Sequence, residues 1–156
     1  MKGIVSLALV CALAFSACTR VTPATTVKQV SFNGVQLMQV VQAMATAVIS
    51  AENSGALSRN RAVAVMTTLK QVTDACNKVI EFLTLLAQTS EPREIKMYSD
   101  GVSRLLEVVN TGIFQAMIPI DDVTLKTDLG LLSLEISRTI ATINRTILGK
   151  AERDAK

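Results

Sequence analysis

The stretch that decides the fold is residues 58–88, SRNRAVAVMTTLKQVTDACNKVIEFLTLLAQ. Its apolar residues recur every three or four positions, and most of its charged and amide residues fall between them. This period places the apolar residues on one face of an α-helix. The sequence therefore predicts a long amphipathic helix with an apolar stripe of Ala62, Val65, Met66, Leu69, Val72, Cys76, Val79, Ile80, Leu83 and Leu86.

Three other segments have the same period, at residues 32–53, at residues 92–117 and from residue 122 or 123 to residue 149. We expect Leu37, Val41, Met44 and Val48 in the first stripe, widened by Met38, Ala45 and Ile49. The next stripe is Ile95, Tyr98, Val102, Leu105, Leu106, Val109, Ile113 and Met117, with Gly101 and Gly112 beside it. The last is Leu125, Leu129, Leu132, Ile136, Ile140, Ile143 and Ile147, broadened by Leu131 and Leu134.

Turn residues separate the four segments. Gly55 suits the left-handed conformation after a helix, and Pro92 and Pro119 cannot continue one. Ser58, Ser90 and one of the residues 121–122 are of the types that cap helix starts. Connections of about three to five residues favour antiparallel neighbours. We therefore predict an all-α, up-down-up-down antiparallel four-helix bundle over residues 32–149, followed by a charged tail at residues 150–156.

The N-terminus has the pattern of an export signal. Lys2 precedes an uncharged apolar run at residues 4–15, and small residues stand just before Cys18. Residues 13–18, LAFSAC, resemble the lipobox of bacterial lipoprotein precursors, although many members have Leu or Val where Phe15 stands here. The resemblance covers the first 18 residues. An ordinary secretory signal cleaved after Ala17 and an uncleaved start are the alternatives.

The lipobox resemblance implies a lipid anchor and a location in the cell envelope. In that family the cysteine receives diacylglycerol, the chain is cleaved before it, and the new N-terminus is acylated. Residues 1–17 would then be a signal peptide, Cys18 the lipid attachment site, and residues 18–31 a tether without helical period. Thr19, as a residue other than Asp after the cysteine, implies the outer membrane, facing the periplasm, in a Gram-negative host.

Composition excludes several classes of protein. With 49% hydrophobic and 19% charged residues the chain is not a disordered one, and no tract of like charge suits nucleic acid. The absence of His removes the usual histidine-based acid–base and metal chemistry. Cys76 replaces an apolar stripe residue and is expected to fill the core. Glu81, Glu107 and Glu135 each lie on a polar face, so we expect no enzyme activity, cofactor or metal.

Counting helices places two connections at the end of the bundle opposite the N-terminus. This tip combines apolar residues with a charged rim, as a partner site would: Leu57, Arg59, Arg61, Ile118, Pro119 and Ile120, beside Asp121 and Asp122. The alternative is that the apolar members simply close the end of the bundle.

Three functions follow as hypotheses. The first is a non-enzymatic, lipid-anchored envelope protein that acts through contact with an unknown protein or with itself. A phage or prophage could encode such a protein. The second is a carrier or sensor of a small apolar ligand held between the helices. The third is an integral membrane protein with a span near residues 30–51, which lack charge; the amide residues Gln36, Gln39 and Gln42 favour a core helix instead.

Overall fold

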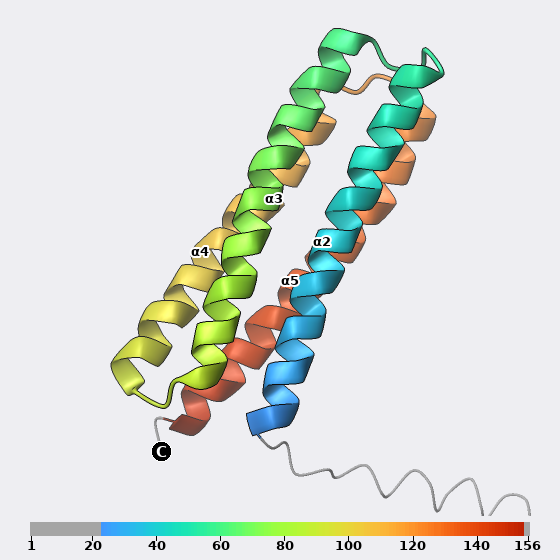
Figure 1. Cartoon of the computed structure of the whole chain (residues 1–156). Helices are drawn as coiled ribbons and strands as arrows, with labels where there is room; N and C mark the ends of the chain where they lie inside the picture. Colours follow the sequence, from blue (N-terminus) through green and yellow to red (C-terminus); the bar gives the residue numbers. More distant parts are fainter. Residues whose placement is uncertain (1–22, 155–156) are drawn as a thin grey trace, which may run out of the picture.

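The computed structural model describes the backbone of residues 23–154 and the side chains of residues 32–147. It contains helices α2 (Pro23–Asn53), α3 (Arg59–Gln88), α4 (Pro92–Met117) and α5 (Val123–Asp154). Consecutive helices run antiparallel (Figure 1), and both α2 and α4 pack against α3 and α5. The described part of the chain is therefore the all-α four-helix bundle that the sequence predicts.

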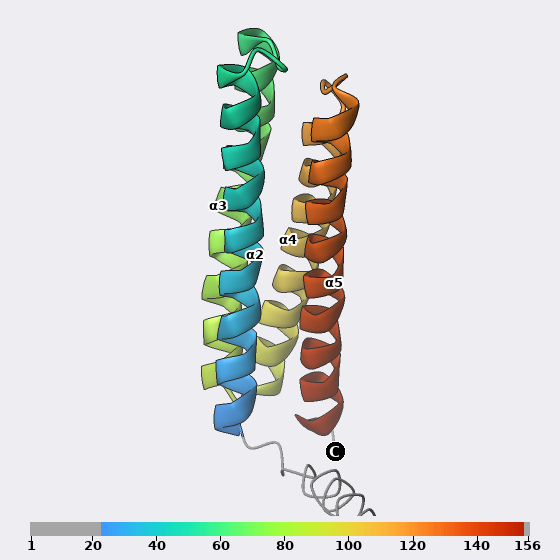
Figure 2. The ribbon, with the colours of Figure 1, turned by 90° about the vertical axis from the view of Figure 1, so that its right-hand side faces the viewer.

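The two ends of the bundle carry different parts of the chain. The start of α2, the end of α5 and the α3–α4 turn share the N-terminal end, and the α2–α3 and α4–α5 connections share the distal end (Figure 1). Viewed from the side, the α2–α3 hairpin lies next to the α4–α5 hairpin (Figure 2). The number of helices predicted that these two connections lie at the end opposite the N-terminus, and this arrangement agrees.

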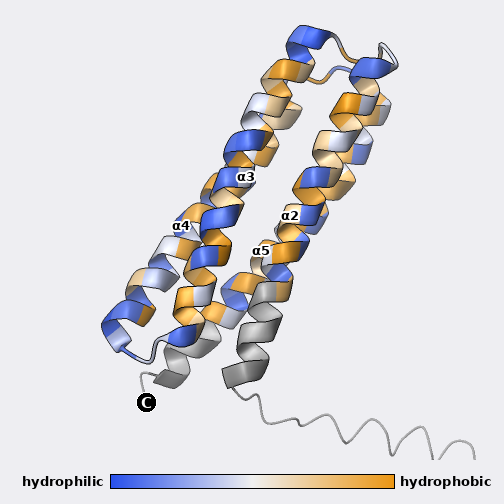
Figure 3. Ribbon diagram, in the orientation of Figure 1, coloured by the Kyte–Doolittle hydropathy of each residue, from blue (hydrophilic) through white to orange (hydrophobic). Residues whose placement is uncertain are grey.

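Each helix buries one apolar stripe in a shared core. Apolar and polar residues alternate along the helices (Figure 3), and the largest fully buried side chains come from all four of them. The predicted stripes supply most of this core. Members of it are Leu37, Met44, Leu69, Leu83, Leu106, Ile113, Leu129, Ile136 and Ile143.

Two helix boundaries differ from the prediction. Helix α2 begins at Pro23 rather than at residue 32, so residues 23–31 are helical and are not part of a tether. Proline is favoured at a first helical position, and no Gly or second Pro interrupts the residues up to 31. Helix α5 continues through Gly149 to Asp154, because good helix formers follow the glycine. Residues 1–22, including Cys18, and residues 155–156 lie outside the described part.

Some of the residues predicted to end or cap the helices do so. Gly55 has a φ of 77°, the left-handed conformation that ends α2. Asp122 caps α5, since its Oδ1 accepts a hydrogen bond of 2.7 Å from the Leu125 backbone N–H. Ser58 stands at the N-cap of α3, but its side chain makes no capping bond. The predicted cap Ser90 is wrong, because Glu91 occupies the N-cap of α4.

Glycines let α3 and α4 approach closely. A Cβ placed on Gly112 would lie 2.5 Å from Val72 Cγ2, and one on Gly101 would lie 2.5 Å from the Phe82 ring. Both distances are far below an ordinary carbon–carbon contact of about 3.5 to 4.0 Å. The prediction that these two glycines permit a close neighbour is confirmed.

Three residues predicted to widen the stripes point to water instead. Leu131 and Leu134 of α5 are 63% and 57% exposed, and Ile49 of α2 is 47% exposed. Each residue advances the helix by about 100°, so an apolar residue next to a stripe can fall outside the buried sector. These three side chains therefore lie on the outer surface of α2 and α5.

Candidate functional site

The distal tip does not form the apolar surface that the sequence predicts. Leu57 and Ile120 are buried, at 3% and 0% exposure, and Pro119 is half-buried. Only Ile118 among the four apolar tip residues is well exposed, at 65%. The geometry therefore supports the alternative to a partner site, in which Leu57 and Ile120 close the end of the bundle.

The charged residues of the tip join its two connections. Arg61, in the first turn of α3, forms an ion pair with Asp121 of the α4–α5 connection. Both side chains are largely exposed, so the pair adds at most about 1 kcal/mol to stability. Arg59 is exposed beside it. The tip is a closed end with a polar rim.

Cys76 is buried in the core, as the sequence predicts. Its exposure is 0%, and desolvation by burial raises the pKa of its thiol from 9.0 to about 12. The thiolate is the reactive form of cysteine. At neutral pH this thiol is therefore protonated and shielded from reagents.

The glutamates of the three later helices do not come together. Glu81 and Glu107 are exposed on α3 and α4. Glu135 of α5 is half-buried and accepts a hydrogen bond of 2.9 Å from Gln36 Nε2 of α2. Within the described residues, no three His, Cys, Asp or Glu side chains are grouped as a metal site requires.

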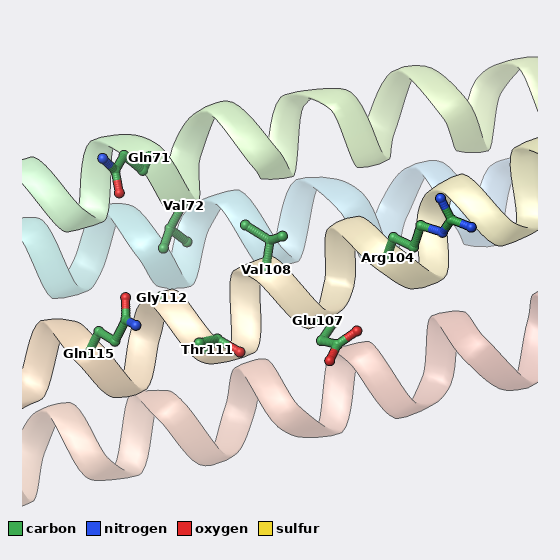
Figure 4. Close-up of a pocket in the computed structure, with 8 residues that line it drawn as sticks. All are labelled: Gln71, Val72, Arg104, Glu107, Val108, Thr111, Gly112 and Gln115. Carbon is green, nitrogen blue, oxygen red and sulfur yellow. The ribbon is translucent and has the colours of Figure 1, made fainter.

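Two grooves lie between neighbouring helices, and both are open to solvent. One of about 310 Å³ runs between α3 and α4, where Val72 points toward the gap at Gly112 and polar side chains surround it (Figure 4). The second, of about 550 Å³ between α2 and α3, is lined partly by Ala45, Val63 and Met66. Neither groove is an enclosed apolar chamber of the kind that a ligand carrier needs.

The outer face of α2 is the most unusual surface of the described part. No Asp, Glu, Lys or Arg occurs between Lys28 and Glu52, so the exposed side of α2 has no charge from residue 32 to residue 51. Phe32 is 67% exposed and Val35 is 50% exposed on it. A solvent-facing helix normally carries charged residues along its outer side.

The α5 side of α2 continues this surface. The Gln36–Glu135 hydrogen bond fixes which side of α5 meets α2. Leu131 lies one turn before Glu135 and therefore on that same side of α5, and Leu134 lies next to it on the outer surface. Glu135 and Arg138 form an ion pair of 3.9 Å on this side of α5, so the exposed leucines adjoin charged groups, whereas the outer face of α2 does not. Exposed apolar residues grouped on one face are typical of a contact surface.

By length and composition, Phe32–Asn53 is also apolar enough to cross a membrane, as a core helix or a signal sequence can be. In the bundle its Leu37, Val41, Met44 and Val48 are buried against the other helices. An N-terminal apolar helix of this kind is weakly compatible with a signal or a membrane anchor.

Comparison with protein-family models, with curated proteins and with solved structures finds no match to this chain. Any functional assignment therefore depends on the chain's own residues. Sequence reasoning identified the uncharged run of α2 but used it only to weigh a membrane span. The signal for a surface was present, because exposed positions such as Val35 and Gln42 fall on the side opposite the buried stripe.

Proposed function

We propose that this protein is a lipid-anchored helical bundle of the bacterial cell envelope that works by protein–protein contact, contact between its own copies included. The observation that carries the proposal is the uncharged outer face of α2, with exposed Phe32, Val35 and Ile49 and the neighbouring Leu131 and Leu134. Exposed apolar side chains grouped on one uncharged face are typical of a surface that a partner covers.

The lipobox resemblance supports the anchor. Helix α2 begins five residues after Cys18, and residues 18–22 can span at most about 18 Å. A lipid on Cys18 would therefore hold the N-terminal end of the bundle close to the bilayer, with the uncharged face of α2 rising from it. Thr19 favours the outer membrane, facing the periplasm, in a Gram-negative host.

The test compares the full precursor with its Cys18→Ala variant in a Gram-negative bacterium. Intact mass and membrane partitioning are measured for both proteins. The proposal expects a mature protein that begins at residue 18, carries acyl chains and sediments with the outer membrane, all lost in the variant. If both proteins retain residues 1–17 and remain in the membrane, the anchor is wrong.

A further inference from the structure

Helix α2 carries two stripes on opposite sides. The inner stripe is in the core, and the outer one, here named the α2 seam, consists of exposed residues spaced alternately by three and four. Its members are Phe32, Val35, Gln39, Gln42, Thr46, Ile49 and Asn53. Residues with this spacing repeat every seven positions and form one line along a helix, as the contact positions of a coiled coil do.

The chemistry of the α2 seam changes along its length. Phe32, Val35 and Ile49 supply apolar side chains, 47 to 67% exposed, toward its two ends. Gln39 and Gln42 lie between them, and neither amide has a hydrogen-bond partner among the described residues. With Thr46 and Asn53, four of the seven seam residues are polar. A polar residue at a coiled-coil contact position fixes the register at a cost in stability, as in a weak contact.

We propose that the α2 seam binds the α2 seam of a second copy of this chain, with the two bundles side by side and parallel. Each seam residue then faces its own counterpart, Phe32 to Phe32 and Ile49 to Ile49. The pairing of two seams follows from the exposed residues and their coiled-coil spacing. The parallel direction rests on the proposed function, because anchors at Cys18 of both copies place the two α2 helices with their starts at one membrane.

The lack of charge favours this occupant over others. Two identical charged faces repel each other, whereas the α2 seam meets its copy without any pair of like charges. A glutamine amide both donates and accepts, so Gln39 and Gln42 can satisfy their counterparts. A lipid surface would leave these amides unpaired and offers no partner for a face without Lys or Arg.

The size of the α2 seam sets the strength of the contact. The 22 residues of Phe32–Asn53 extend about 33 Å at about 1.5 Å per residue, and the strip is about 10 Å wide. This is smaller than the roughly 800 Å² per partner of a stable complex. We therefore expect a weak dimer in dilute solution that forms readily when both copies are tethered to one membrane, where the effective concentration is high.

Single cysteines test the register in the full chain. Cys76 is buried with its thiol pKa raised to about 12, and a lipidated Cys18 has no free thiol, so an added cysteine is the reactive one. The variants are Val35→Cys and Ile49→Cys, both at exposed positions, with Ser103→Cys on the exposed side of α4 as the matched control. Cell envelopes are treated with a mild oxidant and examined for disulfide-linked dimers.

The proposal expects dimers from both α2 variants, at least about tenfold more than from the Ser103→Cys control. Adding Gln42→Glu should lower the Val35→Cys yield by about tenfold, because it places two like charges face to face. The same change at exposed Gln71 of α3 should not alter it. Antiparallel packing of the whole seam would place Val35 opposite Ile49 of the second copy. Mixed Val35→Cys and Ile49→Cys chains would then crosslink while neither variant links to itself, and that result overturns the parallel register.

The anchor and the seam can fail separately. Membrane fractionation of the same samples reports whether the protein is lipid-anchored. Anchored protein in which neither α2 variant crosslinks above the control, alone or mixed with the other variant, overturns the seam alone. Unacylated, soluble protein refutes the anchor, and the three variants are then compared in a Cys18→Ala background that removes the free Cys18 thiol. Crosslinking of both α2 variants above the Ser103→Cys control in that background supports the seam.

Discussion

The close contact of α3 and α4 at Gly112 predicts opposite effects for the same substitution at two glycines. Gly112→Ala places a methyl group 2.5 Å from Val72 Cγ2, whereas Gly130→Ala meets no atom within 4 Å. Val72 is 1% exposed and β-branched, and a helix strongly favours a single rotamer for such a side chain. The α3–α4 pair must separate, or the helix backbone must shift, to admit the new methyl group.

The magnitudes follow from two opposing effects. Alanine in place of glycine stabilises a helix interior by about 0.8 to 1 kcal/mol. Overpacking a core contact costs about 1 to 3 kcal/mol. We therefore expect Gly130→Ala to raise the free energy of unfolding by up to about 1 kcal/mol, and Gly112→Ala to lower it by up to about 2 kcal/mol.

The assay is urea unfolding of the purified protein followed by far-ultraviolet circular dichroism, since the chain has no Trp and one Tyr. The wild-type chain and both variants are compared at equal concentration. The midpoint should rise for Gly130→Ala and fall for Gly112→Ala, with similar slopes. A Gly112→Ala protein as stable as Gly130→Ala would show that α3 and α4 do not approach as closely as described.

Three further predictions use matched positions. Leu129→Ala, at a buried site, should lower the free energy of unfolding by about 2 to 5 kcal/mol, whereas Leu131→Ala on the exposed face should change it by less than about 0.5 kcal/mol in urea unfolding. Asp122→Ala removes the α5 cap and should cost about 1 kcal/mol in thermal unfolding, more than Asp121→Ala, whose loss breaks only an exposed ion pair. Cys76 should resist a thiol reagent at pH 8 until urea is added, and rapid labelling of the folded chain would contradict its burial.

The same thiol gives the direction of a pH effect. The pKa of Cys76 is raised from 9.0 in the unfolded chain to about 12 in the folded one, because burial disfavours the thiolate. The unfolded chain therefore loses this proton first as the pH rises. The contribution of the neutral thiol to stability is complete below pH 9 and falls between pH 9 and pH 12.

The helices were predictable because their signals are local. The three-and-four spacing from Ala62 to Leu86 specifies one buried face, and Gly55 and Pro92 mark where helices must end. The start of α2 was missed because Pro23 read as part of a tether, although proline is well suited to a first helical turn.

The surface was less predictable, because it depends on how four helices meet. Leu131 and Leu134 belong to an apolar sequence pattern, but only the positions of α2 and α4 decide that both face water. At the tip, Leu57 and Ile120 are apolar residues in connections, and only the packing of both connections shows that they close the bundle. Burial at such positions is a property of the assembled helices.

The central claim is that α2 has one face in the core and the other in water, and adjacent cysteines test it most directly. Ala43 is exposed outside the α2 seam, Met44 is 1% exposed, and both lie near the middle of Phe32–Asn53. A charged, membrane-impermeant thiol reagent should label Ala43→Cys at least about tenfold faster than Met44→Cys, because the latter reacts only when the bundle opens. Equal and negligible labelling of both positions would contradict the account and place this segment in the hydrocarbon of a membrane.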